Sequence, residues 1–162
     1  MFTRCAVLTF AAVLSGCGQK GNSETGTLAN KQAEVVERGR SVMPFDIDRS
    51  MHQFRKTPSG GVQQVVSRDG DPRQISLIRE HLKAEADRFA GGDFSDPSAI
   101  HGHDMPGLAT MSAAATRMHV RYSEIPLGAQ VAYASSDPAL VTAIHAWFDA
   151  QVREHGNHAM WM

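Results

Sequence analysis

The chain has 162 residues, of which 42% are hydrophobic and 20% charged, and its formal net charge is −1. This composition excludes a collagen-like or wholly disordered chain, and because the chain carries no basic excess it also argues against binding to nucleic acid. Histidine and methionine each occur eight times, and every histidine lies after position 50.

The N-terminus has the pattern of a bacterial export signal. Arg4 precedes an apolar run over residues 5–14, which is too short to span a bilayer but has the length of a signal-peptide core. The run ends in the sequence LSGC at residues 14–17, which resembles the lipobox of bacterial lipoproteins. The resemblance implies a lipoprotein signal peptide over residues 1–16, cleavage before Cys17 and lipidation of that cysteine. The alternative is an ordinary secretory leader in which Cys17 has no role.

The lipobox also predicts where the mature chain is located and which chemistry it lacks. Several acyl chains on Cys17 would anchor the protein stably to the lipid bilayer. Because Gly18 rather than Asp follows, the sorting pattern of lipoproteins implies the outer membrane, with the domain facing the periplasm. Cys5 leaves with the leader and Cys17 carries the lipid, so disulfides, thiolate metal sites and cysteine nucleophiles are excluded.

The mature chain is predicted to consist of a tether, one domain and a short tail. Residues 17–50 are interpreted as the lipidated cysteine and a flexible tether, because residues 18–30 offer almost nothing apolar to bury. Residues 31–40 have the pattern of a short helix. The folded domain is placed at residues 51–157 and a C-terminal tail at residues 158–162. The end of the chain from His155 onward, which includes His158 and Met160, is either a mobile ligand arm or a frayed terminus.

Within the domain, strand and helix patterns alternate. Strands are predicted at residues 61–66, 118–122 and 129–133 from their apolar content and alternation. The two helices have complete start and stop signals, namely Asp-Pro at residues 71–72 and 137–138 and the terminators Gly91 and Gly156. The order β-α-β-β-α predicts an α+β fold, a small two-layer sandwich in which two helices pack on a mostly antiparallel sheet.

The long connection between the two helices contains the first metal-site hypothesis. In an extended backbone, His101, His103 and Met105 lie on the same side, and Pro106 favours such a backbone for the residue before it. Imidazole together with a thioether suits copper. The sequence therefore predicts a copper site in a His/Met loop. The alternative is that the histidines are solvated and that Met105 packs in the core.

Four other residues are weaker candidates for metal binding. His81 and Glu85 are one turn apart on the first helix, His145 lies on the second helix, and His52 is placed just ahead of the first strand. All four are also compatible with hydrogen-bonded residues at the edge of the core. The chain has no Walker loop, no HExxH and no nucleophile elbow, so the sequence favours a protein that is not an enzyme, with an enzyme that acts through His81, Glu85 and His145 as a third, less favoured interpretation.

Five short motifs resemble an uncharacterised family of exported bacterial proteins. They are TPSGGVQ at residues 57–63, GDF at 92–94, IHG at 100–102, MPGL at 105–108 and HAWFDAQ at 145–151. The resemblance covers roughly residues 50–157, and some members are labelled aspartate carbamoyltransferase. The chain lacks the Ser-Thr-Arg-Thr motif with which carbamoyltransferases bind carbamoyl phosphate. The resemblance therefore implies export and the limits of the domain, and no activity.

Two functional hypotheses follow from the sequence. The first is an envelope-anchored lipoprotein that binds a transition metal, with copper favoured, through the His/Met loop. The alternative is a non-catalytic protein-interaction module of the cell envelope, in which the histidines are structural and the protein partner is unknown.

Overall fold

A computed structural model describes residues 20–162, so the leader at residues 1–16 and Cys17 lie outside the described residues. The elements, in chain order, are α1 (Lys20–Val42), β1 (Ser50–Thr57), β2 (Gly60–Ser67), α2 (Pro72–Ala90), α3 (Ser95–His101), α4 (Leu108–Ala113), β3 (His119–Ile125), β4 (Gly128–Ala134), α5 (Pro138–His155) and β5 (Ala159–Trp161). Short 3₁₀ turns precede β3 and β5.

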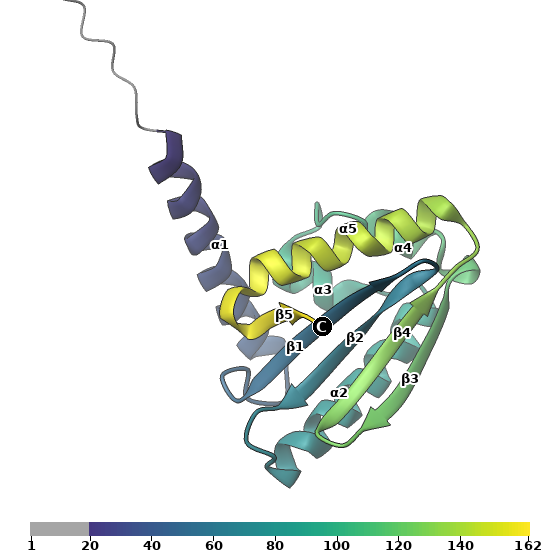
Figure 1. Ribbon diagram of the computed structural model, residues 1–162, viewed down its shortest axis with the longest axis horizontal. Coiled ribbons are helices and arrows are strands. Elements are labelled where there is room, and N and C mark those ends of the chain that lie inside the picture. The colour runs from purple at the N-terminus through teal and green to yellow at the C-terminus, as the bar shows by residue number, and fades with distance from the viewer. Residues whose placement is uncertain (1–19) are drawn as a thin grey trace, which may run out of the picture.

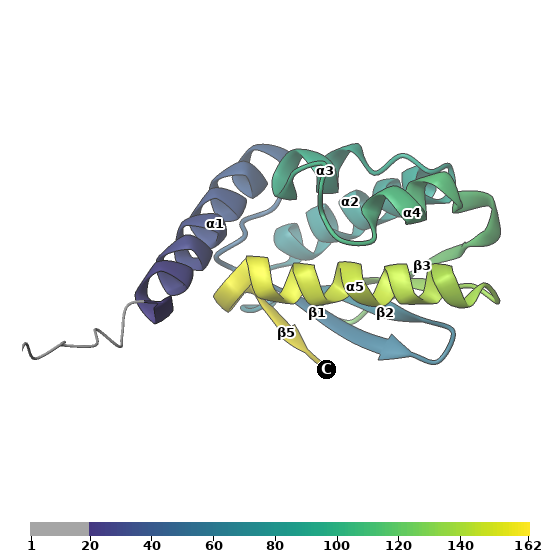
Figure 2. The same cartoon turned by 90° about the horizontal axis from the view of Figure 1, so that it is seen from above.

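The strands form one sheet in the order β3-β4-β2-β1-β5 (Figure 1). Every neighbouring pair is antiparallel except β1 and β5, which run parallel. The helices gather on one side of this sheet (Figure 2), with α2 packed mainly on β3 and β4, and α5 on β1 and β2. The predicted α+β class, with helices packed on a mostly antiparallel sheet, is confirmed.

Helices α2 and α5 begin as their Asp-Pro signals predict. The Asp71 carboxylate accepts a hydrogen bond from the Arg73 amide at 2.8 Å, and Asp137 accepts one from the Ala139 amide at 2.9 Å. In each helix the proline occupies the first turn, where no intrahelical partner is needed for an amide proton. The predicted ends are also confirmed, because α2 ends one residue before Gly91 and α5 one residue before Gly156.

The prediction of a flexible tether is wrong for residues 20–50, whereas the short helix predicted at residues 31–40 is confirmed as part of α1. Most of this stretch is the helix α1, which packs against α3 and α5. Val35 is fully buried, and Phe45 and Ile47 are 4% exposed in the segment that follows. The interpretation failed because it considered only apolar side chains, whereas polar side chains of α1 also hold it to the domain. The folded region therefore begins within α1 and not at residue 51.

The two ends of the predicted domain also differ from expectation. Residues 51–54 belong to β1, so His52 lies within the first strand rather than ahead of it. The predicted tail at residues 158–162 contains β5, in which Ala159 lies opposite His52 and Trp161 opposite Phe54. Burial alternates along the first part of β1, but its charged end hides this pattern in the sequence, and β5 is too short to have a pattern of its own.

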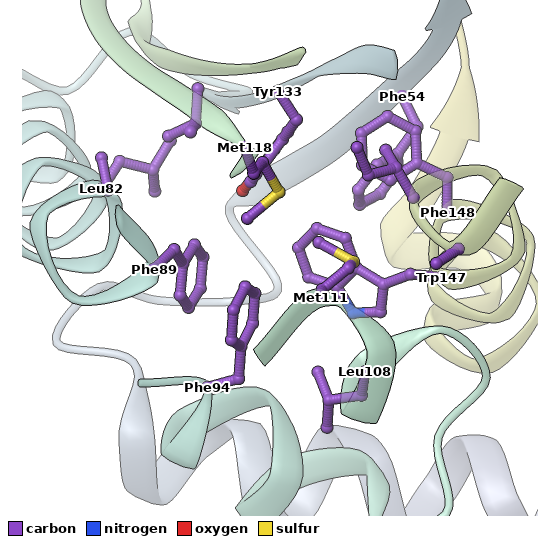
Figure 3. Close-up of a cluster of buried hydrophobic side chains, with 14 of the residues drawn as sticks. Phe54, Leu82, Phe89, Phe94, Leu108, Met111, Met118, Tyr133, Trp147 and Phe148 are labelled. Atoms are coloured by element: carbon purple, nitrogen blue, oxygen red, sulfur yellow. The ribbon is translucent and has the colours of Figure 1, made fainter. Parts of the chain in front are cut away.

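The core lies between the sheet and the helices and is rich in aromatic rings (Figure 3). Phe89 and Phe94 stack with their centroids 4.5 Å apart, and the Trp147 ring stands edge-on to both. Tyr133 and Phe148 continue the cluster towards β4 and β2. This aromatic block fixes α2, α5 and the segment before α3 relative to the sheet.

Candidate functional site

The structure does not assemble the predicted His/Met loop. His101 is the last residue of α3 and is 3% exposed, so the extended backbone predicted there is wrong. His103 is exposed, and its Nδ1 lies 2.6 Å from the Ser98 hydroxyl. Met105 is buried in the hydrophobic core, as the alternative interpretation of that residue expected. Because α3 continues to His101, the backbone is not extended there, and the side chains of His101, His103 and Met105 lie in different surroundings.

His101 instead joins a buried polar cluster at the C-terminal end of α5. Its Nδ1 lies 3.0 Å from a Glu154 carboxylate oxygen, and its Nε2 lies 3.2 Å from Nε2 of His155. Because a carboxylate only accepts, Nδ1 of His101 donates to it. In the Nδ1–H tautomer the Nε2 atom of His101 has a lone pair, which accepts from Nε2–H of His155. Burial alone would raise the pKa of Glu154, but hydrogen bonds from His101 and Arg153 hold it below its ordinary value.

His52 forms the third side of this cluster. Its ring stacks on His155, with the centroids 4.9 Å apart and the planes 14° apart. Burial, with a smaller effect of nearby His81, lowers the pKa of His52 to about 4, and burial lowers the pKa of His155 well below its usual value. Both rings are therefore neutral at pH 7. Within residues 20–162, Nδ1 of His52 is buried without a hydrogen-bond partner.

A cavity of about 40 Å³ opens beside the three histidines. By volume it has room for about three water molecules. Its wall includes His81 and Glu85 of α2, so the structure brings these two predicted candidates close to His52 and His101. Aromatic and amide side chains complete the polar part of the wall: Gln63, Tyr133, Trp147 and Gln151. No lysine or arginine belongs to the described lining.

The two candidates on α2 are both shifted towards their uncharged forms. Burial raises the pKa of the Glu85 carboxyl to about 7, although Arg88 donates a hydrogen bond to it. Burial lowers the pKa of His81 to about 4. The His81 ring packs edge-on against Phe45, with centroids 5.7 Å apart. Arg88 also bonds Asp96 at 2.6 Å, so it lies between two carboxyl groups.

His145, the remaining candidate, has a structural role. Its Nε2 lies 3.0 Å from the Thr57 carbonyl oxygen and 2.8 Å from that of Gly60. A protonated Nε2 therefore donates to the turn between β1 and β2. His145 is not among the residues that line the cavity, so it is removed from the candidate site.

Helix α1 forms the outer cover of the histidine cluster. The Lys31 ammonium donates to the carbonyl oxygen of His101 at 2.5 Å and lies 3.9 Å from Glu154. The Gln32 amide donates to the Arg153 carbonyl at 2.8 Å. These bonds join α1 to the two helix ends that carry the cluster, so access to His101 and His155 depends on the position of α1.

Sequence reasoning missed Glu154 and assigned His155 only to a C-terminal ligand arm or frayed terminus, although the sequence contains a signal that His155 is buried. Trp147, Gln151 and His155 are spaced by four residues on α5 and therefore lie along one face of that helix. All three line the cavity. A histidine that ends such a row is expected to face the same side as the buried residues before it. The pairing with His101 depends on the position of α3, for which no local pattern gives a signal.

The two imidazole rings of His101 and His155 have a geometry that suits binding of one metal ion. Two nitrogens that bind one ion at about 2.0–2.1 Å with near-tetrahedral geometry lie about 3.3 Å apart. The two Nε2 atoms of His101 and His155 are 3.2 Å apart. In residues 20–162 no group of three or more His, Cys, Asp or Glu side chains is arranged to hold a metal ion. The pair of rings offers two nitrogen atoms to an ion, and the cavity beside it has room for water.

The described part of the chain contains no helix with the length and apolar character that a membrane crossing requires. Lipidation at Cys17 and the resemblance to an exported family stay predictions. Comparison of the chain with protein-family models, with curated proteins and with solved structures finds no match.

Proposed function

We propose that this protein is an envelope-anchored lipoprotein that binds a transition metal ion between His101 and His155. One observation carries the proposal: the two buried Nε2 atoms lie 3.2 Å apart, a separation suited to one shared ion. This site replaces the His/Met loop, because Met105 is buried in the core and His103 bonds Ser98.

The surroundings of the pair support metal binding in two ways. Histidine ligands usually donate their second ring proton to a carboxylate or carbonyl, which orients the ring and makes the ligating nitrogen more basic. Glu154 stands in that position towards His101. His155 is neutral at pH 7 because burial lowers its pKa, so binding an ion at its Nε2 requires the ring proton to move to Nδ1 but no net loss of a proton.

The ligand chemistry favours copper among the transition metals. Imidazole binds copper, zinc, iron and nickel, and for a given nitrogen site the affinity of divalent ions is highest for Cu²⁺. The predicted mature chain offers no thiolate, which removes the main ligand of structural zinc sites. With Cys17 lipidated, the site would face the periplasm from the outer membrane.

The proposal is tested by titrating the purified chain with CuCl₂ and ZnCl₂ in a calorimeter. We expect one copper ion per chain, bound more tightly than zinc, and a loss of affinity of at least about tenfold in His101→Gln and in His155→Gln. His103→Gln and Met105→Leu are matched controls that should bind as the wild type does. Circular dichroism verifies that each variant is folded. Binding that survives both cluster variants, or no binding at micromolar copper, contradicts the proposal.

One observation favours the alternative of a non-catalytic envelope interaction module. The N-terminal part of α1 projects from the rest of the molecule (Figure 1), and its residues 26–30 are all exposed. A projecting helix is a common element of recognition by a partner groove. Crosslinking from Leu28 in intact cells tests this function, and a specific protein partner that is retained by His101→Gln and His155→Gln supports it over metal binding.

A further inference from the structure

The wall of the cavity on α2 carries a buried carboxyl group, which is negative when it is ionised. Glu85 is 6% exposed, and its carboxyl group accepts a hydrogen bond from Arg88. Arg88 also bonds Asp96, so with both carboxylates ionised the three groups together have one net negative charge. Arg88 and Asp96 do not line the cavity, whereas Glu85 does. Because no lysine or arginine is found in the described lining, the cavity repels anions and attracts cations.

Aromatic rings form part of the same cavity wall. Phe89, Tyr133 and Trp147 all line the cavity. The Trp147 ring stands nearly perpendicular to Phe89 and to Tyr133, at 87° and 82°, so the rings present differently oriented surfaces around one space. A ring face attracts a cation within about 6 Å of its centroid, and the attraction is strongest away from water. A carboxylate combined with aromatic rings is the chemistry that recognises an ammonium group.

The size of the cavity limits the occupant. A volume of about 40 Å³ holds about three water-sized groups, so a guest with two or three non-hydrogen atoms fits and a tetraalkylammonium ion does not. A small primary amine also has protons to donate. Acceptors for these protons include the Glu85 carboxylate and the side-chain oxygen of Gln151, another residue of the wall.

We infer that the cavity beside Glu85 is a binding site for a small primary ammonium ion of the methylammonium class. The Glu85 carboxylate provides the countercharge, and Phe89, Tyr133 and Trp147 provide the aromatic walls. This inference does not rest on the proposed metal site, because it uses Glu85 and the aromatic wall rather than the paired nitrogens of His101 and His155. Either proposal can therefore fail while the other holds.

The test uses the fluorescence of Trp147. The chain contains two tryptophans, so Trp161→Phe, at an exposed position, leaves Trp147 as the only tryptophan emitter. Methylammonium chloride is titrated at pH 8, where Glu85 is ionised, and KCl and tetramethylammonium chloride are titrated in parallel at equal ionic strength. We expect a saturable change in emission with methylammonium alone. An equal response to KCl, or no saturable response, overturns the inference.

Two variants show which charge is responsible. Glu85→Gln keeps the shape of the side chain and is expected to weaken methylammonium binding at least about tenfold. Glu80→Gln removes an exposed carboxylate from the same helix and should leave the binding unchanged. Unchanged binding in Glu85→Gln overturns the inference. If Glu85→Gln does not fold, the titrations of the unchanged cavity with methylammonium chloride, KCl and tetramethylammonium chloride still test the inference.

Discussion

His52 and His155 stack face to face, with ring centroids 4.9 Å apart and planes 14° apart, although one lies in the first strand and the other at the end of the last helix. Two charged imidazolium rings would repel each other in this position. Burial lowers the pKa of both rings, so they are neutral and stack without charge repulsion. The contact joins β1 to the C-terminal end of α5.

This stacking predicts the effect of two substitutions at His52. His52→Phe keeps an aromatic ring on His155 and removes the unpartnered Nδ1, so we expect a free energy of unfolding within about 1 kcal/mol of the wild type. His52→Ala leaves a void beside His155 and should cost about 2–4 kcal/mol. Urea denaturation measures both. Equal losses in the two variants would show that the polar nitrogens, and not the ring contact, stabilise this position.

The docking of α1 can be tested through its buried valine. Val35 is fully buried, and Val35→Asp places an unpaired carboxyl group in that contact, so we expect α1 to separate from α3 and α5. Hydrogen exchange should then become faster in residues 31–42 while β2 and β4 stay protected. Leu28→Asp, at an exposed position of the same helix, is the control and should have no such effect. Unchanged exchange in Val35→Asp contradicts the docked helix.

His81 and Glu85 should give opposite pH dependences of stability. The pKa of His81 is about 4 in the folded chain and 6.5 in the unfolded chain, so the unfolded state binds the proton first and stability falls as the pH falls from 6.5 to 4. The pKa of Glu85 is about 7 in the folded chain and 4.5 in the unfolded chain, so the unfolded state loses the proton first as the pH rises. The stability that Glu85 contributes is therefore complete below pH 4.5 and is lost as the pH rises to 7. Each full shift corresponds to roughly 3 kcal/mol.

Single variants separate the two effects. Relative to the wild type, His81→Gln should lose less stability between pH 6.5 and 4, and Glu85→Gln should lose less between pH 4.5 and 7. Denaturation in urea across this pH range measures both differences. Curves that run parallel to the wild type for either variant contradict the corresponding shift.

Gly107 should tolerate no side chain. Its φ is +81°, and a Cβ atom there would lie 2.1 Å from the carbonyl oxygen of Ala143 on α5. Gly107→Ala therefore has to push α4 away from α5, and we expect a loss of more than about 3 kcal/mol. Gly26→Ala is the matched control, because nothing lies within 4 Å of a Cβ at that helical position. Thermal melting compares the two, and similar melting temperatures would contradict the close contact.

Metal removal provides a further check on the proposed function. An ion that binds only the folded chain stabilises it by about 2.7 kcal/mol when the free ion is at a hundred times its dissociation constant. We therefore expect CuCl₂ to raise the melting temperature and EDTA to return it to the value of the metal-free chain. His101→Gln should gain clearly less at the same free copper, about 1.4 kcal/mol or less if its affinity is at least tenfold lower. A copper effect of equal size in His101→Gln contradicts the site.

Local signals in the sequence predicted the elements whose structure is decided locally. The starts at Asp71 and Asp137 were found because a cap and a proline act within one turn of the helix. The strand β5 was missed because its three residues form a strand only through pairing with β1. The position of α1 was missed for a similar reason, since Lys31 and Gln32 bond to carbonyl groups that the fold brings to them.

Sequence analysis identified most residues of the candidate site but not which of them lie together. His52, His81, Glu85 and His101 were all considered from the sequence, and all four line one cavity. The grouping with His103 and Met105 failed because it assumed an extended backbone where α3 is helical. His101 and His155 meet across α3 and α5, and such a meeting is decided by tertiary packing rather than by spacing.

Helix α1 would make the connection between the predicted anchor and the domain stiff. A helix of 23 residues is about 35 Å long and far stiffer than a tether of the same number of residues. If Cys17 holds the bilayer, α1 acts as a strut that sets the standoff of the domain and restricts its swing. Lys31 of this strut is bonded to the carbonyl of His101, so a force on the anchor is transmitted directly to the wall of the histidine cluster.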